Sequence, residues 1–295
     1  MTDAPTQRPP GSNPISSVSD TARWVAMYRA MESERPDALF HDPYARRLAG
    51  ATGEQILSSL PQGRRWAWPM ITRTAVMDEI IMRLVSEQGV DTILNLAAGL
   101  DARPYRLNLA AELRWIDVDL DTILSYKEAA LAGERANCRI EFVKADLRDP
   151  VTRRALFQRV SASARRVLVI SEGLLVYLEP EDVKALATDL AAQSMFRWWL
   201  IDLSSPQLLE WLRRTWGNQL RSGNAPMIFA PAEGSAFFAP TGWREAEYHP
   251  ILDAAMRLHR APKMAWLWKA LGLLASKKRR EQFKRFSGVV LLERS

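Results

Sequence analysis

Residues 93–104 read Ile93-Leu94-Asn95-Leu96-Ala97-Ala98-Gly99-Leu100-Asp101-Ala102-Arg103-Pro104, an apolar run that breaks into small residues and one glycine. The run from 90 to 96 has a β-branched start and the length of a buried parallel strand. Small residues directly after a strand let a ligand lie against the backbone. In an open α/β sheet, ligands bind at this end of the strands. The sequence therefore predicts a turn that holds a nucleoside-bearing cofactor.

Strands and helices are predicted to alternate along the chain from this run onward. Strands are expected at 91–96, 114–118, 139–144, 166–171, 197–203, 243–248 and 287–293. Helices are expected between the first five of these strands at 104–112, 121–132, 151–160 and 180–194. Helical spacing also predicts three earlier helices at 21–33, 41–49 and 64–88, and a later one at 264–274. Such alternation is typical of βαβ units and a mainly parallel sheet.

Composition divides the chain into a short arm and one domain. Residues 1–17 lack apolar periodicity and are expected to form a flexible arm, and 18–295 form a single domain. Within the domain we expect a helical cover at 18–89, a cofactor-binding core at 90–203 and a sheet-completing segment at 243–295. Residues 204–242 are rich in proline, glycine and aromatics, which favours an irregular lid or acceptor-binding insertion. Three bulky residues of the first helix are expected to bind the acceptor with it: Arg23, Trp24 and Tyr28.

Charge and cysteine content limit the compartment and the partners. The single cysteine, Cys138, excludes an internal disulfide and suits a reducing compartment. No secretory signal and no apolar run of about 20 residues is found, so we expect a cytoplasmic protein without membrane contact. The net charge of +6 favours a solvated basic surface. The basic run 277–280, with Lys284 and Arg285, is interpreted as a solvated helix face; a docking patch for an acidic carrier protein or RNA is the alternative. Aromatic interleaving, which RNA binding favours, is missing from the run, so no nucleic-acid partner is expected.

The spacing between Gly99 and Asp119 indicates the kind of cofactor. Asp119 lies 20 positions after Gly99 at the end of the second predicted strand, where a carboxylate can accept from both hydroxyls of a ribose. A helix cap is the alternative role. The spacing alone fits a nicotinamide cofactor or S-adenosylmethionine. However, the turn lacks G-x-G-x-x-G, and Asp101 puts an acid where a pyrophosphate needs positive potential. The turn therefore favours a ligand without phosphates, such as S-adenosylmethionine with its positive sulfonium.

Two further acids follow predicted strands at the same edge of the sheet. Asp146 could accept from an adenine amino group while Leu147 packs on the ring, although a turn role for Asp146 is equally open. Glu172 follows the most apolar predicted strand and faces the same crevice. Both residues are therefore candidates for the cofactor site.

Several motifs occur in a fixed order over residues 19–200. They are Ser19-Asp20-Thr21-Ala22, His41-Asp42-Pro43-Tyr44, Arg73-Thr74, the run from Asn95 to Arg103, Asp117-Val118-Asp119, Ala145-Asp146-Leu147-Arg148, and Ser171-Glu172-Gly173-Leu174-Leu175-Val176-Tyr177-Leu178. Together they resemble the leucine carboxyl methyltransferase family, and more closely its bacterial O-methyltransferase branch, which includes polyketide-tailoring enzymes. The resemblance implies a class I methyltransferase fold of the α/β class, Rossmann-like, with a seven-stranded, mainly parallel sheet and an antiparallel last strand. It also implies S-adenosylmethionine as the cofactor.

The resemblance also implies roles for single residues. Arg73 would bind the methionine carboxylate of the cofactor, and Ala97 and Gly99 would lie under it. Asp119, with Leu120 beside it, would take the ribose, Asp146 and Leu147 the adenine, and Glu172 would lie near the methionyl amino group. One residue departs from the family, whose turn usually reads Gly-Ala-Gly: here the first position is Ala97, whose methyl group narrows the approach of a ligand.

Methyl transfer from a sulfonium needs a well-placed acceptor oxygen more than a reactive side chain. Tyr177 and His249 are the candidates for a general base, and no Cys/His cluster has the spacing of a metal site. The expected function is therefore S-adenosylmethionine-dependent methylation of a carboxyl or hydroxyl oxygen of a small, polyketide-like metabolite. A nicotinamide-dependent oxidoreductase and, because of Ala97, a non-catalytic cofactor-binding module are the alternatives. The acceptor and the oligomeric state are left open.

Overall fold

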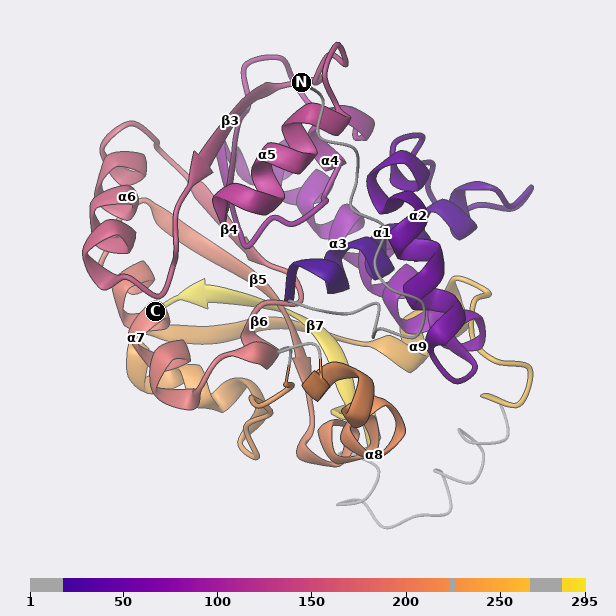
Figure 1. Ribbon diagram of the computed structural model, residues 1–295. Coiled ribbons are helices and arrows are strands. Elements are labelled where there is room, and N and C mark those ends of the chain that lie inside the picture. Colours follow the sequence, from indigo (N-terminus) through magenta and orange to yellow (C-terminus); the bar gives the residue numbers. More distant parts are fainter. Residues whose placement is uncertain (1–17, 223–225, 266–282) are drawn as a thin grey trace.

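A seven-stranded sheet runs through the computed structural model, which describes residues 18–222, 226–265 and 283–295 (Figure 1). Its strands are β1 (Thr92–Leu96), β2 (Arg114–Asp119), β3 (Arg139–Lys144), β4 (Val167–Ser171), β5 (Phe196–Ser204), β6 (Trp243–Pro250) and β7 (Ser287–Arg294). Their order is β3-β2-β1-β4-β5-β7-β6, and β7 runs antiparallel to both of its neighbours. The pairs among β1 to β5 are parallel. The predicted α/β fold of class I methyltransferases, with its antiparallel last strand, is confirmed.

Helices cover both faces of the sheet. They are α1 (Val18–Ser33), α2 (Ala45–Ser59), α3 (Ala67–Gln88), α4 (Arg103–Arg106), α5 (Asp121–Ala130), α6 (Pro150–Ala162), α7 (Pro180–Ala191), α8 (Pro206–Ser222) and α9 (Ile251–Arg257), with 3₁₀ turns η1 (Gly63–Trp66), η2 (Leu175–Tyr177) and η3 (Gly234–Thr241). One face packs on α6, α7 and η3, where Trp199 of β5 meets Phe238 at 5.3 Å between ring centroids. The other face packs on α3 and α9 around Trp115. A third cluster joins α1, α2 and the start of α3 to Leu100 in the turn after β1.

Local signals set most element ends where the sequence predicts them. Asp149 caps α6 by accepting from the N–H groups of Val151 and Thr152, as an N-cap aspartate does. Gly89 ends α3 in the left-handed conformation, with φ 62°. The helix expected at 104–112 is wrong in extent, because α4 ends at Arg106, where Leu107 takes an extended conformation.

Two expectations about the helical cover and the insertion need correction. The second helix is interrupted at Gly50 as predicted, with φ 59° and ψ −172°, but it begins at Ala45 and a second helical segment that was not predicted continues α2 to Ser59. Residues 204–242 are not uniformly irregular, because α8 begins at Pro206 and η3 occupies Gly234–Thr241. The predicted arm 1–17, the basic run 277–280 and most of the helix expected at 264–274 lie outside the described residues.

The turn after β1 contains two left-handed residues. Ala97 has φ 52° and Gly99 has φ 49°. A Cβ on Gly99 would also lie 3.2 Å from the Cβ of Ala22 in α1, so this glycine suits both the turn and the packing of the helix against it. An alanine in the left-handed region costs roughly 1–2 kcal/mol. The position at which the chain departs from Gly-Ala-Gly is thus one where glycine is favoured for its backbone.

A fully buried ion pair lies beneath that turn. Lys127 Nζ of α5 donates to Asp117 Oδ2 of β2 at 2.6 Å, and both side chains are completely buried. Asp117 Oδ1 also accepts from Trp115 Nε1 at 2.8 Å and from Asn95 Nδ2 at 3.0 Å. The pair therefore ties α5 to β2 and, through Asn95, to β1.

No helix in the described ranges is long and apolar enough to cross a membrane.

Replacing Lys127 with alanine should lower the free energy of unfolding by about 3–5 kcal/mol, because Asp117 stays buried without its counter-charge. Chemical denaturation of variant and wild type measures the loss. Lys144→Ala is the matched control, because Lys144 is 42% exposed and pairs with Asp121 and Glu128 at the surface. Its loss should change stability far less. Equal losses in the two variants would contradict a stabilising role for the buried pair.

Ala97→Gly should raise the free energy of unfolding by about 0.5–1 kcal/mol, because relief of the left-handed conformation exceeds the added backbone entropy of the unfolded chain. Ala98→Gly is the control, since Ala98 does not have a positive φ. That variant should lose at least about 0.5 kcal/mol. Thermal unfolding of both variants checks the difference, and a loss of stability in both would show that Ala97 is not strained.

Candidate functional site

A cavity of about 920 Å³ lies at the carboxyl ends of the parallel strands. Its floor comes from the turn after β1, the ends of β2, β3, β4 and β5, and the segments that follow them. Its cover comes from α1, the start of α3, α8 and the residues after α8. The strand order reverses between β1 and β4, which is where open α/β sheets bind their ligands. The cavity is therefore the candidate functional site.

Asp119 and Gly99 form a small polar cradle on the floor. Asp119 Oδ2 accepts from the N–H of Gly99 at 2.7 Å, and Oδ1 accepts from the N–H of Leu120 at 2.7 Å. Burial raises the pKa of Asp119, and the two backbone N–H groups only partly oppose that effect. Gly99, Ala97 and Leu120 also line the cavity. The residues expected at the ribose end of a cofactor are thus brought together.

Asp146 and Leu147 line the same cavity after β3. Arg148 donates to the carboxylate of Asp146 from Nε at 3.0 and 3.1 Å and from Nη2 at 2.6 Å. This partner lowers the pKa of Asp146. The carboxylate is 40% exposed and is therefore ionised and accessible from the cavity.

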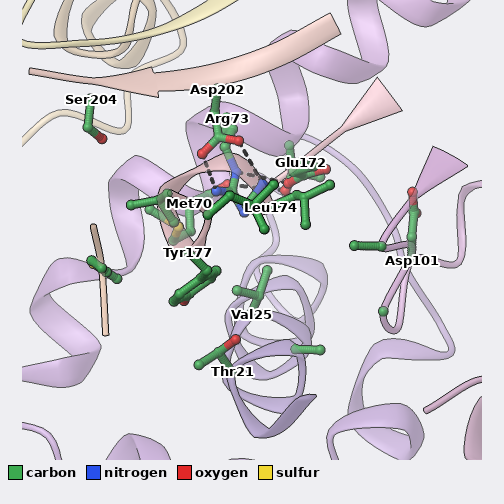
Figure 2. Close-up of a pocket in the computed structure, with 18 of the residues that line it drawn as sticks. Thr21, Val25, Met70, Arg73, Asp101, Glu172, Leu174, Tyr177, Asp202 and Ser204 are labelled. Carbon is green, nitrogen blue, oxygen red and sulfur yellow. Dashed lines mark hydrogen bonds and ion pairs between the residues drawn. The ribbon is translucent and has the colours of Figure 1, made fainter. Parts of the chain in front are cut away.

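Arg73 lies between two carboxylates at the polar wall of the cavity, as Figure 2 shows. Its Nε donates to Glu172 Oε1 at 2.9 Å, and its Nη1 donates to Asp202 Oδ2 at 2.9 Å. Asp202 Oδ1 accepts from the N–H of Gly173 at 2.6 Å. Burial alone would lower the pKa of Arg73, but Asp202 and Glu172 outweigh it and raise that pKa. Among the described residues, none accepts a hydrogen bond from Nη2 of Arg73, so that nitrogen remains available to a ligand.

A guanidinium–carboxylate network extends from Arg73 under the floor. Arg103 Nη1 donates to Glu172 Oε2 at 2.7 Å and to Asp101 Oδ2 at 2.8 Å, while its Nε donates to Asp78 at 2.6 Å. Arg106 also donates to Asp78, and Arg29 donates to Asp42 at 2.8 Å. Arg106 Nε lies 3.9 Å from Asp42, which joins the two parts. The guanidinium–carboxylate network consists of nine residues: Arg29, Asp42, Arg73, Asp78, Asp101, Arg103, Arg106, Glu172 and Asp202.

The network keeps its acids ionised despite their burial. For Glu172, burial would raise the pKa, but the charges of Arg103 and Arg73 outweigh it and hold the pKa below the usual value. The same balance, with Arg103 and Lys127 as the main cations, holds the pKa of Asp101 well below its usual value. Asp101, which was predicted to repel a pyrophosphate, is therefore ionised at neutral pH.

The candidates for a general base differ in position. Tyr177 lines the cavity, and Figure 2 shows its ring beside Met70 and near Thr21. Burial raises the pKa of Tyr177, so its hydroxyl stays protonated at neutral pH and is suited to donate a hydrogen bond. His249 is not among the residues that line the cavity; its Nε2 lies 2.9 Å from Glu247 Oε2 on β6. We therefore assign neither residue the role of base.

Of the three α1 residues that were expected to bind the acceptor, one lines the cavity and two do not. Trp24 lines the cavity. Arg23 does not, because its guanidinium lies over the ring of Tyr126 at 3.7 Å. Tyr28 is 1% exposed and donates to the carbonyl of Gly63 at 2.7 Å, so it packs the helical cover together. Tyr28 lies on the same face of α1 as Trp24, four residues away and 5.7 Å between ring centroids, but deeper in the helical cover.

Three residues of the site had not been singled out from the sequence. Asp202 lies two residues before the end of β5, inside the strand predicted at 197–203, so an acid within an apolar strand was an available signal. Arg103 stands next to the turn, but its contact with Asp78 joins residues 25 positions apart. Asn95 donates to Asp101 in the turn and to Asp117, which the pairing of β1 with β2 brings to it. In the described parts of the chain, no group of three His, Cys, Asp or Glu residues could hold a metal ion.

Comparison with known proteins agrees with this geometry. Residues 22–191 match the family described as leucine carboxyl methyltransferase. The chain is 32% identical over 254 residues to a protein of Streptomyces avermitilis, covering 81% of this chain and 87% of that one. It is 34% identical over 262 residues to a protein of Saccharopolyspora erythraea, covering 83% and 90%. Both relatives have the provisional name S-adenosyl-L-methionine-dependent methyltransferase.

Solved structures show the same fold at low sequence identity. A crystal structure of a DUF574 family protein from Streptomyces avermitilis has a TM-score of 0.58 and 14% identity, covering 93% of this chain and 97% of that one. A structure titled as a methyltransferase, on a provisional basis, from Thermobifida fusca has a TM-score of 0.58 and 15% identity, covering 99% and 100%. The family match spans more than half of the 295 residues and includes every motif from Arg73 to Tyr177. This chain belongs to the leucine carboxyl methyltransferase family.

Proposed function

We propose that the protein is an S-adenosylmethionine-dependent O-methyltransferase that acts on a carboxyl or hydroxyl oxygen of a small, polyketide-like metabolite. The observation that carries this proposal is the cradle of Asp119 and Gly99 at the carboxyl end of the sheet. Family membership and the names of the two relatives support the cofactor and the type of transfer. The kind of oxygen that is methylated and the class of acceptor are proposed from the residues of the cavity and not from the relatives.

The cradle fits the nucleoside part of this cofactor. An ionised carboxylate offers about four acceptor positions, and the backbone N–H groups of Gly99 and Leu120 use only two of those of Asp119. Two positions are left for the hydroxyl donors of a ribose. Leu147 and Asp146 lie at the end of the neighbouring strand, where the leucine can pack on the adenine and the carboxylate can accept from its amino group.

Arg73 and Glu172 fit the amino-acid part of the cofactor. A guanidinium has five N–H donors, and Arg73 uses two of them on Glu172 and Asp202. The remaining donors at Nη2 can bind a carboxylate, for which arginine has the matching geometry. Glu172 offers negative charge beside it for an ammonium group. When bound, the cofactor supplies a methyl group that its sulfonium already activates.

The charge of the floor favours this cofactor over a dinucleotide. Asp101, Asp119 and Glu172 are carboxylates at the cavity, and a pyrophosphate would be repelled by them.

The hydroxyl of Tyr177 is suited to donate a hydrogen bond and not to accept a proton, which leaves positioning of the acceptor as the main contribution of the residues around it. Of the basic residues considered for an acidic carrier protein, Arg285 is already paired with Glu245 at 2.8 Å, and Lys284 lines the cavity. A carrier-bound acceptor therefore stays a secondary part of the proposal.

Calorimetric titration with S-adenosylmethionine, S-adenosylhomocysteine and NAD tests the proposed function. We expect micromolar or tighter binding of the first two, with no heat from NAD, because the cavity matches a phosphate-free nucleoside with a positive charge. A parallel titration of Asp119→Ala should show a loss of affinity for both. Binding of NAD alone would favour the oxidoreductase. Cofactor binding without transfer to a broad acceptor panel would favour the non-catalytic module.

Arg73→Ala should lower the affinity for S-adenosylmethionine about thirtyfold or more, because it removes one member of a desolvated charge pair, at roughly 2–5 kcal/mol. It should also lower the stability of the cofactor-free protein, since Glu172 and Asp202 lose a buried partner. Arg73→Lys should recover only part of the affinity.

Arg260→Ala separates these two effects. Arg260 is 7% exposed in its side chain and donates to the buried Glu32, and it is not among the residues that line the cavity. It should lose stability but keep its affinity for the cofactor. Calorimetry and thermal unfolding of the ligand-free proteins measure both quantities, and equal cofactor affinity in Arg73→Ala and Arg260→Ala would remove Arg73 from the binding site.

A further inference from the structure

Aromatic and thioether side chains wall the cavity beyond the cofactor cradle. Trp66 of η1 and Trp211 of α8 lie 4.7 Å apart between ring centroids, inclined by 60°. Trp24 of α1, Met70 of α3 and Met227 after α8 complete this wall. Indole rings and thioethers bind flat apolar surfaces through dispersion and ring contacts, with little directional hydrogen bonding. This part of the cavity therefore suits a planar apolar molecule.

The segment after α8 is held in place on the cavity. The N–H of Ile228 donates to the carbonyl of Val176 at 2.6 Å, and Arg213 Nε donates to the carbonyl of Met227 at 3.0 Å. Met227 thus lines the cavity from a segment that is bonded to both η2 and α8, and Trp211 lines it from α8. The apolar wall is part of the folded site.

The arginines that line the cavity already form ion pairs with carboxylates of the chain. Five arginines line the cavity, and each has an acidic partner: Arg29 with Asp42, Arg73 with Glu172 and Asp202, Arg103 with Asp78, Asp101 and Glu172, Arg148 with Asp146, and Arg153 with Asp189. Lys284 also lines the cavity, but it is exposed and hence hydrated. Nη2 of Arg73 is assigned to the cofactor, and Nη2 of Arg103 is buried from solvent without a partner. Each desolvated cation that a carboxylate acceptor could meet in the described lining therefore already pairs with a carboxylate of the chain.

Asp202 adds negative charge where the acceptor would approach the end of β5. Asp202 and Ser204 are two residues apart on the strand, so their side chains share one face, and Figure 2 shows both at the cavity. The side chain of Asp202 is 23% exposed, compared with 15% for Glu172. Each of its oxygens has one partner in the chain, Gly173 N for Oδ1 and Arg73 for Oδ2, which leaves lone pairs for a donor. Asp202 can accept a proton from an acceptor hydroxyl, whereas it would repel an acceptor carboxylate.

We propose that the acceptor is a flat, apolar molecule that presents an uncharged hydroxyl group, and that Asp202 takes the proton of that hydroxyl. This inference rests on the proposed function and chooses between its two kinds of oxygen. The acceptor oxygen uses a lone pair to form the bond to the methyl carbon, the sulfur keeps the electron pair of the broken carbon–sulfur bond, and the hydroxyl proton passes to a carboxylate oxygen of Asp202. The products are the methyl ether, the neutral thioether and protonated Asp202, so charge and atoms balance.

Three probes that share a two-ring skeleton test the acceptor class. They are 2-naphthol, which is flat and uncharged, 2-naphthoic acid, which is flat and ionised at neutral pH, and 2-decalol, which is uncharged but not flat. Binding to the wild-type protein loaded with S-adenosylhomocysteine is followed by calorimetry and by quenching of tryptophan fluorescence. We expect 2-naphthol to bind at least about tenfold more tightly than either of the others. Equal or tighter binding of the naphthoate overturns the uncharged hydroxyl, and equal binding of 2-decalol or no binding of 2-naphthol near millimolar concentration overturns the flat apolar acceptor.

Asp202→Asn tests the role of the carboxylate, because asparagine has nearly the same size but no charge, and its single oxygen can accept from Gly173 or from Arg73 but not from both in the present geometry. The variant should narrow the preference for 2-naphthol over 2-naphthoic acid, and it should methylate 2-naphthol about a hundredfold more slowly than the wild type. Glu79→Gln makes the same change of charge at a half-exposed site on α3 that pairs with Arg257, and it should keep both properties. An unchanged preference, an unchanged rate, or wild-type protein that binds 2-naphthol without methylating it would overturn the assignment of Asp202.

Trp211→Leu tests the wall by itself. It should weaken 2-naphthol binding about tenfold and reduce the fluorescence quenching, whereas Trp198→Leu, on β5 outside the lining, should change neither. Equal effects in the two variants would show that the wall does not hold the probe.

Affinity for S-adenosylhomocysteine is measured in every variant. Failure of the cofactor to bind wild type refutes the proposed function, whereas normal cofactor binding with preferred naphthoate refutes only this inference.

Discussion

The guanidinium–carboxylate network is the constraint on which the site depends. It joins Arg29 of α1 and Arg73 of α3 to the carboxyl ends of β1, β4 and β5, through side chains that are mostly buried. Charges taken out of water are tolerated only when they are paired with good geometry. α1 and α3 therefore each have one position relative to the sheet in which their arginines are compensated. The network does not show that the protein is unusually stable, but it specifies where the cover lies.

That placement divides the cavity into two chemically distinct parts. The strand ends supply carboxylates and backbone N–H groups around Asp119, Asp101 and Glu172, which suits a polar cofactor with a positive centre. The cover supplies Trp24, Trp66, Met70 and Trp211, which suit an apolar acceptor. Asp202 and Arg73 lie where the two parts meet (Figure 2). The same arginine thus holds the cover on the sheet, and under the proposed function its remaining N–H groups bind the cofactor, so folding and binding would share one side chain.

Sequence reasoning succeeded where the signal was local. The strands around Asn95, Asp119, Asp146 and Glu172 are short apolar runs followed by small or acidic residues, and the structure places their carboxyl ends at one cavity. It failed where bulky composition was the only guide. Arg23, Trp24 and Tyr28 were expected to bind the acceptor together, but only Trp24 lines the cavity. Arg23 lies over the ring of Tyr126, and Tyr28 packs against Trp24 and donates to Gly63 inside the helical cover. The helical segment from Gly50 to Ser59 was also missed, although the break at Gly50 was predicted correctly.

The sequence by itself determined the α/β architecture, the strand ends that form the floor and the departure at Ala97, because strand length, apolar runs and glycine preferences are properties of neighbouring residues. Only the tertiary structure decided the partners of the buried charges and the acceptor side of the cavity. Arg73 meets Glu172 and Asp202, which are 99 and 129 positions away, and Trp66 meets Trp211. Such contacts depend on how strands are ordered and how helices cross them, and no local pattern encodes which distant acid will compensate a given arginine.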